Sequence, residues 1–213
     1  MFSVVVAMDK NRGIGREGRL PWKLAGDMRF FKDLTTCPDR AAVERRYRLA
    51  PESDSNAFSS PEEFFARLKT EPQLPMPDPN LRNAVLMGRN TWESLPPAYK
   101  PLPGRVNGVL SRGGTQGGAG THKVFGDLDQ ALQELDRDES VSEVYVIGGA
   151  QIYADALRSP ACGRIYATTV ESEFPCDVFF PDNPDGFREV AAGTRLEEDG
   201  IPYRFHLWQR DIK

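Results

Sequence analysis

The sequence predicts a single α/β domain with a central, mostly parallel sheet, helices on both of its faces and an antiparallel strand at its C-terminal edge. Short apolar runs typical of buried strands alternate with amphipathic helical segments through most of the 213 residues. Gly-rich turns follow several of these runs. The tail, residues 187–210, alternates apolar and polar residues as an antiparallel hairpin does. No internal repeat and no linker marks a second domain, so we expect one domain over residues 1–213.

Composition and charge are those of an ordinary globular protein. The chain is 39% hydrophobic and 27% charged, and its net charge of −4 gives no reason to expect nucleic acid or a membrane surface as a partner. It has no apolar span of ~18 residues that could form a membrane helix. Its three Cys form no CxxC motif, and its two His argue against a His-rich metal site. We therefore expect a cytoplasmic monomer with reduced thiols and no metal.

The first elements are a buried strand over residues 2–8 and a Gly-rich loop over residues 9–20. Gly13, Gly15 and Gly18 match the spacing of a dinucleotide-binding fingerprint. That fingerprint requires a helix to open at its third Gly, and here Pro21 delays the helix, so we reject this interpretation. A flexible lid beside a site is the better interpretation of the loop.

The next segment predicts a helix from Pro21 to about residue 35. Leu24, Asp27, Phe31 and Leu34 share one face of it at helical spacing. A carboxyl group in an apolar stripe costs roughly 2–7 kcal/mol if it finds no partner. Asp27 therefore needs an internal partner or a cationic ligand, unless it is simply a first-turn residue that favours the helix dipole.

Residues 38–82 differ from the rest because Pro recurs with Ser and charged residues between. We interpret this stretch as an insertion, too rich in Pro to form a core element. Ser60-Pro61-Glu62-Glu63 predicts a capped short helix, which Phe64, Phe65 and Leu68 would dock on the body. A peripheral decoration is the first hypothesis for the insertion, and a partner surface or a rim over the substrate mouth are the alternatives.

The remaining elements follow in alternation. The sequence predicts strands over residues 83–87, 106–110, 123–125, 144–147 and 164–170, a helical start over residues 88–95, a helix capped at Asp127, a helix after Gly149 and the closing hairpin.

Three predicted strand ends carry groups suited to phosphate, and ligands of open α/β sheets collect at such ends. Gly88–Thr91 offers free N–H groups, an Arg and a hydroxyl, Ser111–Arg112 offers a hydroxyl and a guanidinium, and Gly148–Gly149 allows close backbone approach before a helix. Each signal alone is weak. Together they favour a dinucleotide with an extra phosphate, and hence NADPH over NADH.

Several of these segments together carry a family resemblance. They are Pro21–Asp27 with Phe31–Lys32, Met87–Ser94, Pro101–Arg105, Leu110–Arg112, Val146–Tyr153, Ile165–Thr168 and Phe179–Pro181. In this order they resemble the dihydrofolate reductase family over nearly the whole chain except residues 38–82. Cys176 departs from the Gly of some members, so the family's loop dynamics are not carried over.

The resemblance implies roles for the matching residues. The implied catalytic residues are Asp27, Trp22, Leu20 and Tyr153, with Asp27 holding the pterin and Trp22 and Thr168 fixing a water near it. The implied substrate residues are Ala7, Asp27, Met28, Phe31, Lys32, Leu95, Leu102, Arg105 and Thr168, with Arg105 binding the carboxylate of the glutamate tail. The implied cofactor residues are Ala7, Ile14, Gly15, Leu20, Gly88, Arg89, Asn90, Thr91, Ser94, Leu110, Ser111, Arg112, Ile147, Gly148, Gly149, Ala150, Gln151, Ile152 and Tyr153. Residues 12–20 would form a lid, and Asp177 would latch it.

The activity that this resemblance implies is the NADPH-dependent reduction of 7,8-dihydrofolate to 5,6,7,8-tetrahydrofolate in one-carbon metabolism, with inhibition by antifolates such as 2,4-diaminopteridines. No His lies in the matched motifs, so a buried Asp27 with a raised pKa would promote protonation of the substrate nitrogen through a water. A riboflavin-pathway reductase of related fold is one alternative, against which the pterin-binding segment Pro21–Phe31 speaks. A non-catalytic binding module that recruits a partner through residues 38–82 is another, which oxidation of NADPH by dihydrofolate would exclude.

Overall fold

The computed structural model describes residues 1–49, 61–70, 74, 80–113, 122–182 and 186–211. Among these residues, nine strands form one sheet and two more pair separately. The strands are β1 (Phe2–Asp9), β2 (Gly13–Gly15), β3 (Arg82–Gly88), β4 (Val106–Leu110), β5 (Lys123–Phe125), β6 (Val141–Val146), β7 (Cys162–Val170), β8 (Val178–Phe179), β9 (Phe187–Ala192), β10 (Leu196–Glu198) and β11 (Ile201–Arg210). The helices are α1 (Ala25–Thr36), α2 (Arg40–Arg46), α3 (Pro61–Thr70), α4 (Arg89–Ser94), the 3-10 turn η1 (Pro97–Tyr99), α5 (Leu128–Asp136) and α6 (Ala150–Arg158).

The centre of the sheet is parallel and one edge is antiparallel. The strand order is β10-β11-β7-β1-β6-β3-β4-β5, with β9 also paired to β11. All pairings from β7 through β1 to β5 are parallel. β11 runs antiparallel to β7 and carries β9 and β10 on its other side. The fold class predicted from the sequence is therefore confirmed.

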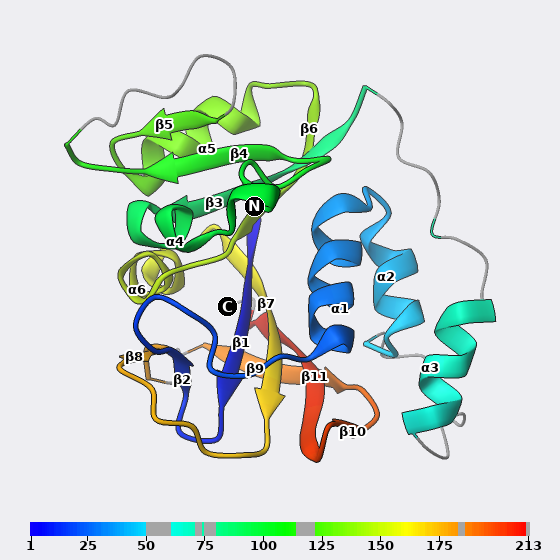
Figure 1. Cartoon of the computed structure of the whole chain (residues 1–213). Helices are drawn as coiled ribbons and strands as arrows, with labels where there is room; N and C mark the ends of the chain where they lie inside the picture. Colours follow the sequence, from blue (N-terminus) through cyan, green and yellow to red (C-terminus); the bar gives the residue numbers. More distant parts are fainter. Residues whose placement is uncertain (50–60, 71–73, 75–79, 114–121, 183–185, 212–213) are drawn as a thin grey trace.

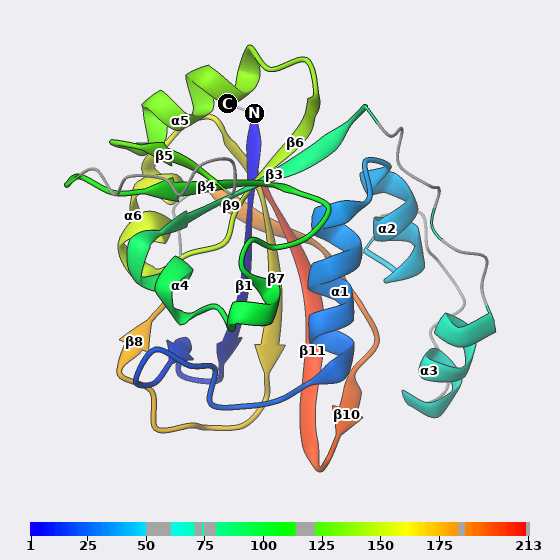
Figure 2. The same cartoon turned by 45° about the horizontal axis from the view of Figure 1, so that its top comes forward.

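Helices cover both faces of this sheet (Figures 1 and 2). Successive residues of a strand point to opposite faces, so Val5 packs with α1, α2 and α3 whereas Val4 and Val6 pack with α5 and α6. This two-sided burial explains why the strands are continuous apolar runs. In the part of the chain that the structure describes, no helix has both the length and the apolar character needed to cross a membrane.

Helix α1 begins later than the sequence predicts. Leu24 is still extended, with φ −124° and ψ 109°, and the first helical residue is Ala25 rather than Pro21. A carboxylate distant in the sequence fixes this start, because Glu198 accepts a hydrogen bond from the Ala25 N–H at 2.8 Å. The apolar stripe also differs, since Phe30 is buried and Phe31 is only half-buried.

The Gly-rich loop is more ordered than we expected. Gly13 and Gly15 belong to β2, which pairs antiparallel with β8. The buried Asp9 carboxylate accepts hydrogen bonds from the Gly13 N–H at 2.6 Å and from the Phe174 N–H at 2.9 Å. The sequence alone predicted a flexible loop over residues 9–20. Hydrogen bonds that its backbone and Asp9 form with the loop that contains Phe174 and β8 instead hold it in place.

The insertion contributes to the core, which corrects the expectation that it is too rich in Pro to do so. Val43 of α2 is fully buried, and so is the Tyr47 ring, which packs edge-on against Phe30 at 4.8 Å between centroids. Pro38 precedes α2 and Pro61 starts α3, so neither breaks a helix interior. The side chain of Asp39 caps α2 by accepting from the Ala42 N–H at 3.0 Å, a signal that the sequence analysis overlooked.

Helix α3 docks as predicted. Phe64 and Leu68 are buried in the same core as α1, and Arg29 of α1 donates to the Leu68 carbonyl at 3.0 Å. Figure 1 shows α1, α2 and α3 lying together on one side of the sheet. The predicted capping residue Ser60 and most of the Gly-rich loop over residues 113–120 lie outside the described residues.

Tyr47→Ala is expected to lower the free energy of unfolding by about 3–5 kcal/mol, the range for removing a large buried aromatic side chain. The substitution also leaves Asp33 without the hydroxyl that donates to it at 2.9 Å. Chemical denaturation of this variant measures the loss. Arg45→Ala, at an exposed position of α2 two residues before Tyr47, is the control and should change stability by less than ~0.5 kcal/mol. A Tyr47 variant as stable as that control would show that α2 is peripheral.

Candidate active site

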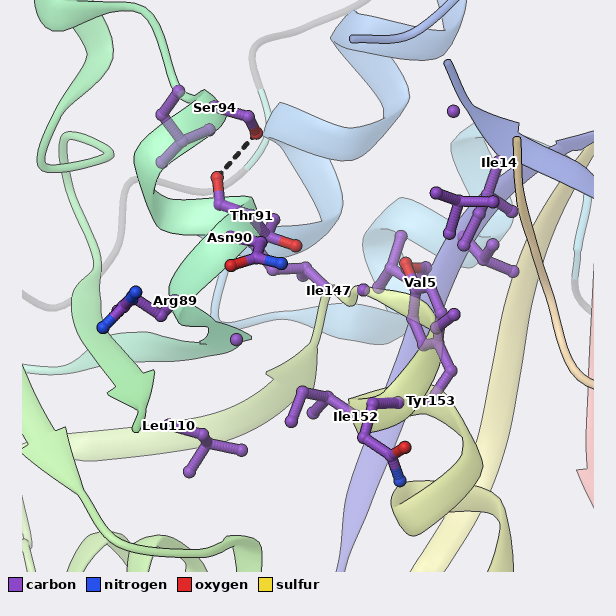
Figure 3. Close-up of a pocket in the computed structure, with 18 of the residues that line it drawn as sticks. Val5, Ile14, Arg89, Asn90, Thr91, Ser94, Leu110, Ile147, Ile152 and Tyr153 are labelled. Carbon is purple, nitrogen blue, oxygen red and sulfur yellow. Dashed lines mark hydrogen bonds between the residues drawn. The ribbon is translucent and has the colours of Figure 1, made fainter. Parts of the chain in front are cut away.

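One large cavity, of about 1010 Å³, opens where the parallel strands end. Its wall includes the carboxyl-terminal parts of β1, β3 and β4 and the residue after β6, at Ala7, Gly88, Leu110 and Ile147. Helices α1, α4 and α6 and the loop around β2 complete the wall. Figure 3 shows α4 residues on one side and Ile152 and Tyr153 of α6 on another, with Val5 and Ile14 bordering the same space.

Asp27 is the carboxylate at the α1 wall of this cavity, and it is only 6% exposed. Thr168 of β7 donates a hydrogen bond from Oγ1 to Asp27 Oδ1 at 2.6 Å. Burial raises the pKa of Asp27 from its ordinary value of 3.8 to about 6; the Thr168 hydrogen bond opposes this rise and the nearby Glu198 charge adds to it. The group can thus change protonation state close to neutral pH.

This raised pKa has a consequence for stability. In the unfolded chain Asp27 ionises near pH 4, so between pH 4 and pH 6 the folded state holds a proton that the unfolded state has lost. The contribution of Asp27 to stability is therefore fully present below pH 4 and is lost as the pH rises through about 6, at a cost of about 3 kcal/mol.

As the pH rises from 4 to 7, the unfolding free energy of Asp27→Asn should increase by about 3 kcal/mol relative to that of wild type. Wild type loses stability in this range because its buried carboxyl group ionises, whereas Asn has no charge to desolvate. Urea denaturation of both proteins across this range measures the difference. A stability difference that is constant with pH would contradict the buried, raised-pKa state of Asp27.

The part of the cavity next to Asp27 is apolar. Phe30, Phe31, Leu95 and Leu102 line it, and Met28 stands at its mouth with 54% of its surface exposed. Such a wall suits an aromatic ligand that presents polar groups to Asp27.

Arg105, expected at the substrate, and Trp22, expected at a water near Asp27, do not line the cavity. The Arg105 guanidinium lies 5.6 Å from the Phe31 ring centre, and donates to Thr35 Oγ1 at 2.7 Å. Burial lowers the pKa of Arg105 to about 10, and no carboxylate among the described residues pairs with it. Trp22 is also buried, and its indole Nε1 finds no acceptor in the described part of the chain.

The opposite part of the cavity is formed by Gly residues and helix starts. The Gly88 N–H donates to the Gly148 carbonyl at 2.7 Å, and a side chain at Gly88 or Gly148 would press on Ile152 or Tyr153 at 3.0–3.1 Å. Helix α6 starts beside them without a side-chain cap, so its first N–H groups are available to a ligand. Close backbone approach and free N–H groups are what a pyrophosphate requires.

Polar and cationic side chains surround this part. Arg89, Thr91, Ser111 and Arg112 all line the cavity, as predicted. Arg89 forms an ion pair with Glu93, 3.2 Å between Nε and Oε1, and Ser94 donates to the Thr91 carbonyl at 2.7 Å (Figure 3). No ion pair within 4.0 Å holds Arg112 among the described residues. Arg112 is thus the more available cation for an anionic ligand.

The loop that we expected to be a lid is attached to the loop that faces it. Asp177 accepts from the Glu17 N–H at 2.8 Å, and the Asp177 N–H donates to the Gly15 carbonyl at 3.0 Å. Leu20, at the end of this loop, lines the cavity and is 46% exposed.

The structure brings most of the predicted site residues to one cavity. Those that line it are Ala7, Ile14, Gly15, Leu20, Asp27, Met28, Phe31, Gly88, Arg89, Asn90, Thr91, Ser94, Leu95, Leu102, Leu110, Ser111, Arg112, Ile147, Gly149, Ala150, Gln151, Ile152, Tyr153 and Thr168. Those that do not are Trp22, Lys32, Arg105 and Gly148, of which Lys32 is exposed on α1.

Ten residues that line the cavity were not among the predicted site residues: Gly18 and Arg19 belong to the predicted lid, and the other eight are Val5, Val6, Phe30, Gly126, Asp127, Leu128, Asp155 and Val178. Gly126–Leu128 follows β5, so the rule that ligands collect at the carboxyl ends of strands could have found it. Val5 and Val6 lie inside a strand, and nothing in their spacing marks them.

A family model and individual curated relatives point to the same family. The family model described as dihydrofolate reductase matches residues 1–39 and 79–210, which leaves residues 40–78 unmatched. The chain is 33% identical over 236 residues to a dihydrofolate reductase of Pneumocystis carinii and 29% identical over 215 residues to one of Drosophila melanogaster, covering 97% of each. It is also 38% identical over 215 residues to a bifunctional dihydrofolate reductase-thymidylate synthase of Daucus carota. These three matches include 98–99% of the chain, but the chain spans only about a third of the length of that bifunctional relative.

Proposed function

The chain belongs to the dihydrofolate reductase family, and we propose that it reduces 7,8-dihydrofolate to 5,6,7,8-tetrahydrofolate with NADPH. In this reaction a hydride goes to C6 of the pterin and a proton to N5. One observation carries the proposal: the Asp27 carboxylate is buried in the apolar wall of a cavity that also offers helix N–H groups and cationic side chains suited to a dinucleotide.

Asp27 is suited to hold the pterin. An ionised carboxylate accepts two hydrogen bonds side by side, which matches the 2-amino group and N3 of a pterin ring. Thr168 fixes its orientation through the 2.6 Å hydrogen bond. Negative charge placed against this end of the ring raises the basicity of N5, and a water that Trp22 Nε1 donates to can deliver the proton.

The cofactor part of the cavity fits a phosphorylated dinucleotide. Its free N–H groups at the start of α6 suit a pyrophosphate, and Ser111 with Arg112 suits a 2′-phosphate. When bound, the reduced nicotinamide supplies the hydride. The cavity volume of about 1010 Å³ is enough for two ligands side by side, since a drug-sized ligand occupies a pocket of roughly 300–1,000 Å³.

Arg105 completes the substrate site in this proposal. A buried guanidinium without a carboxylate partner among the described residues is costly, and an acidic ligand group removes that cost. The glutamate tail of dihydrofolate supplies such a group, reaching Arg105 past Phe31. The loop around β2, held by Asp177, excludes bulk water from the reacting atoms.

The test is an absorbance assay of NADPH oxidation on addition of dihydrofolate, with inhibition by a 2,4-diaminopteridine as a second readout. We expect turnover that requires both substrates and that the inhibitor abolishes. Absence of NADPH oxidation with dihydrofolate, in protein shown to be folded, would contradict the proposal.

A further inference from the structure

The start of α1 is capped by a carboxylate from another part of the chain. The N-cap residue Leu24 contributes no side-chain hydrogen bond. Instead, both oxygens of Glu198 are used: Oε2 accepts from the Ala25 N–H at 2.8 Å and Oε1 from the Gly26 N–H at 2.9 Å. Asp27 follows directly in the same first turn, so this cap sets where the site carboxylate enters the cavity.

Glu198 is itself held in place. It ends β10 next to a tight turn in which Asp199 and Gly200 have φ of +49° and +75°. The hydroxyl of the fully buried Tyr203, on β11, donates to Glu198 Oε1. A side chain at Gly26 would collide with that hydroxyl, and its Cβ would lie 2.8 Å from Glu198 Oε1 and 3.1 Å from the Phe65 ring of α3. The cap is therefore enclosed by α1, the hairpin and the insertion.

The cap also affects charge at Asp27. The positive end of a helix stabilises an ionised carboxylate in its first turn. Here Glu198 occupies two of the N–H groups that produce this effect and adds a negative charge of its own. Both consequences disfavour ionisation of Asp27.

In the described part of the chain, the other side chains that interact with Asp27 are uncharged. They are Thr168 of β7, Tyr153 of α6 and Tyr203 of β11. Burial raises the pKa of both tyrosines far above their ordinary value, so neither ionises near neutral pH. Glu198 is the charged side chain in this set, and its repulsion contributes to the raised pKa of Asp27.

We propose that Glu198 is a positioning residue for the reaction: it caps the helix that carries Asp27 and keeps a fixed negative charge beside that carboxylate. This role rests on the proposed function of Asp27. The insertion takes part through α3, because the Phe65 ring lies beside Gly26 at the cap. The Glu198 cap therefore connects α3, which the family model does not match, to the protonation state of Asp27.

The test is a pH titration of the Asp27 carboxyl carbon by NMR in the ligand-free protein, with the signal assigned by its loss in Asp27→Asn. Glu198→Gln removes the charge and keeps the size of the side chain, so we expect it to lower the pKa of Asp27 by about half a pH unit or more. Glu197→Gln is the matched control, since Glu197 is exposed on the same strand and lies 3.9 Å from Arg195. It should leave the titration of Asp27 unchanged.

Two further variants separate charge from folding. Tyr203→Phe removes the hydroxyl but keeps the Glu198 charge, so it should lower the melting temperature with little change in the pKa of Asp27. Gly26→Ala displaces the Glu198 side chain without changing any charge, so it should lower the pKa of Asp27 as Glu198→Gln does. It replaces Glu198→Gln in the test if that variant fails to fold. Equal titration curves in wild type, Glu198→Gln and Gly26→Ala, or equal shifts in Tyr203→Phe and Glu198→Gln, would overturn the role. Because no substrate is present, this result is independent of whether wild type reduces dihydrofolate.

Discussion

Asp27→Asn is expected to lower the kcat for dihydrofolate reduction at neutral pH by about 100-fold or more while NADPH binding stays within about twofold. Asn is nearly the same size, so the hydrogen bond from Thr168 can persist and the cavity keeps its shape. It carries no charge, so it neither raises the basicity of the pterin nitrogen nor binds two pterin N–H groups as well as a carboxylate does. Steady-state kinetics and fluorescence titration with NADPH measure the two quantities.

The control for this variant is Asp136→Asn, at an exposed position at the C-terminal end of α5 that does not line the cavity. It should leave kcat unchanged. The assignment of Asp27 fails if Asp27→Asn retains wild-type turnover at pH 7. A loss of NADPH binding in Asp27→Asn would also contradict the proposal, which assigns Asp27 to the substrate and not to the cofactor.

Arg112→Ala is expected to weaken NADPH binding by about 10- to 100-fold and NADH binding by less than about threefold. A charge-assisted hydrogen bond to phosphate contributes roughly 1.5–3 kcal/mol, and NADH lacks the 2′-phosphate. Arg112 suits this role better than Arg89, because Arg89 already pairs with Glu93 at 3.2 Å. Dissociation constants of both cofactors for wild type and variant give the comparison.

Arg137→Ala provides the matched control, since Arg137 is an exposed residue at the C-terminal end of α5. It removes the same charge from the protein and should leave both dissociation constants unchanged. Equal losses for NADPH and NADH in Arg112→Ala would show that Arg112 does not recognise the 2′-phosphate.

The predicted site residues that line the cavity follow local rules. Asp27 could be predicted because a carboxyl group in an apolar helical stripe is costly unless it binds a partner. Gly88, Ser111 and Gly149 could be predicted because they follow strands. The alternation of strands and helices was enough for the fold class. Each of these signals lies within a few residues of the feature that it predicts.

The errors concern contacts between segments far apart in the chain. Pro21 indicated a helix start, but Glu198 caps the helix at Ala25. The Gly-rich loop indicated flexibility, but β2 pairs with β8. The Pro content of residues 38–82 indicated a peripheral segment, but Tyr47 packs against Phe30 and Phe205. Local sequence propensity cannot predict such contacts, because they form only when segments distant in the sequence meet in the folded protein.

A crystal structure of the complex with dihydrofolate and oxidised NADP tests the central claim most directly. In our proposal, the 2-amino group and N3 of the pterin lie within hydrogen-bonding distance of the two Asp27 oxygens, with the nicotinamide ring against the same pterin. A pterin bound with its polar edge away from Asp27, or outside this cavity, would contradict it.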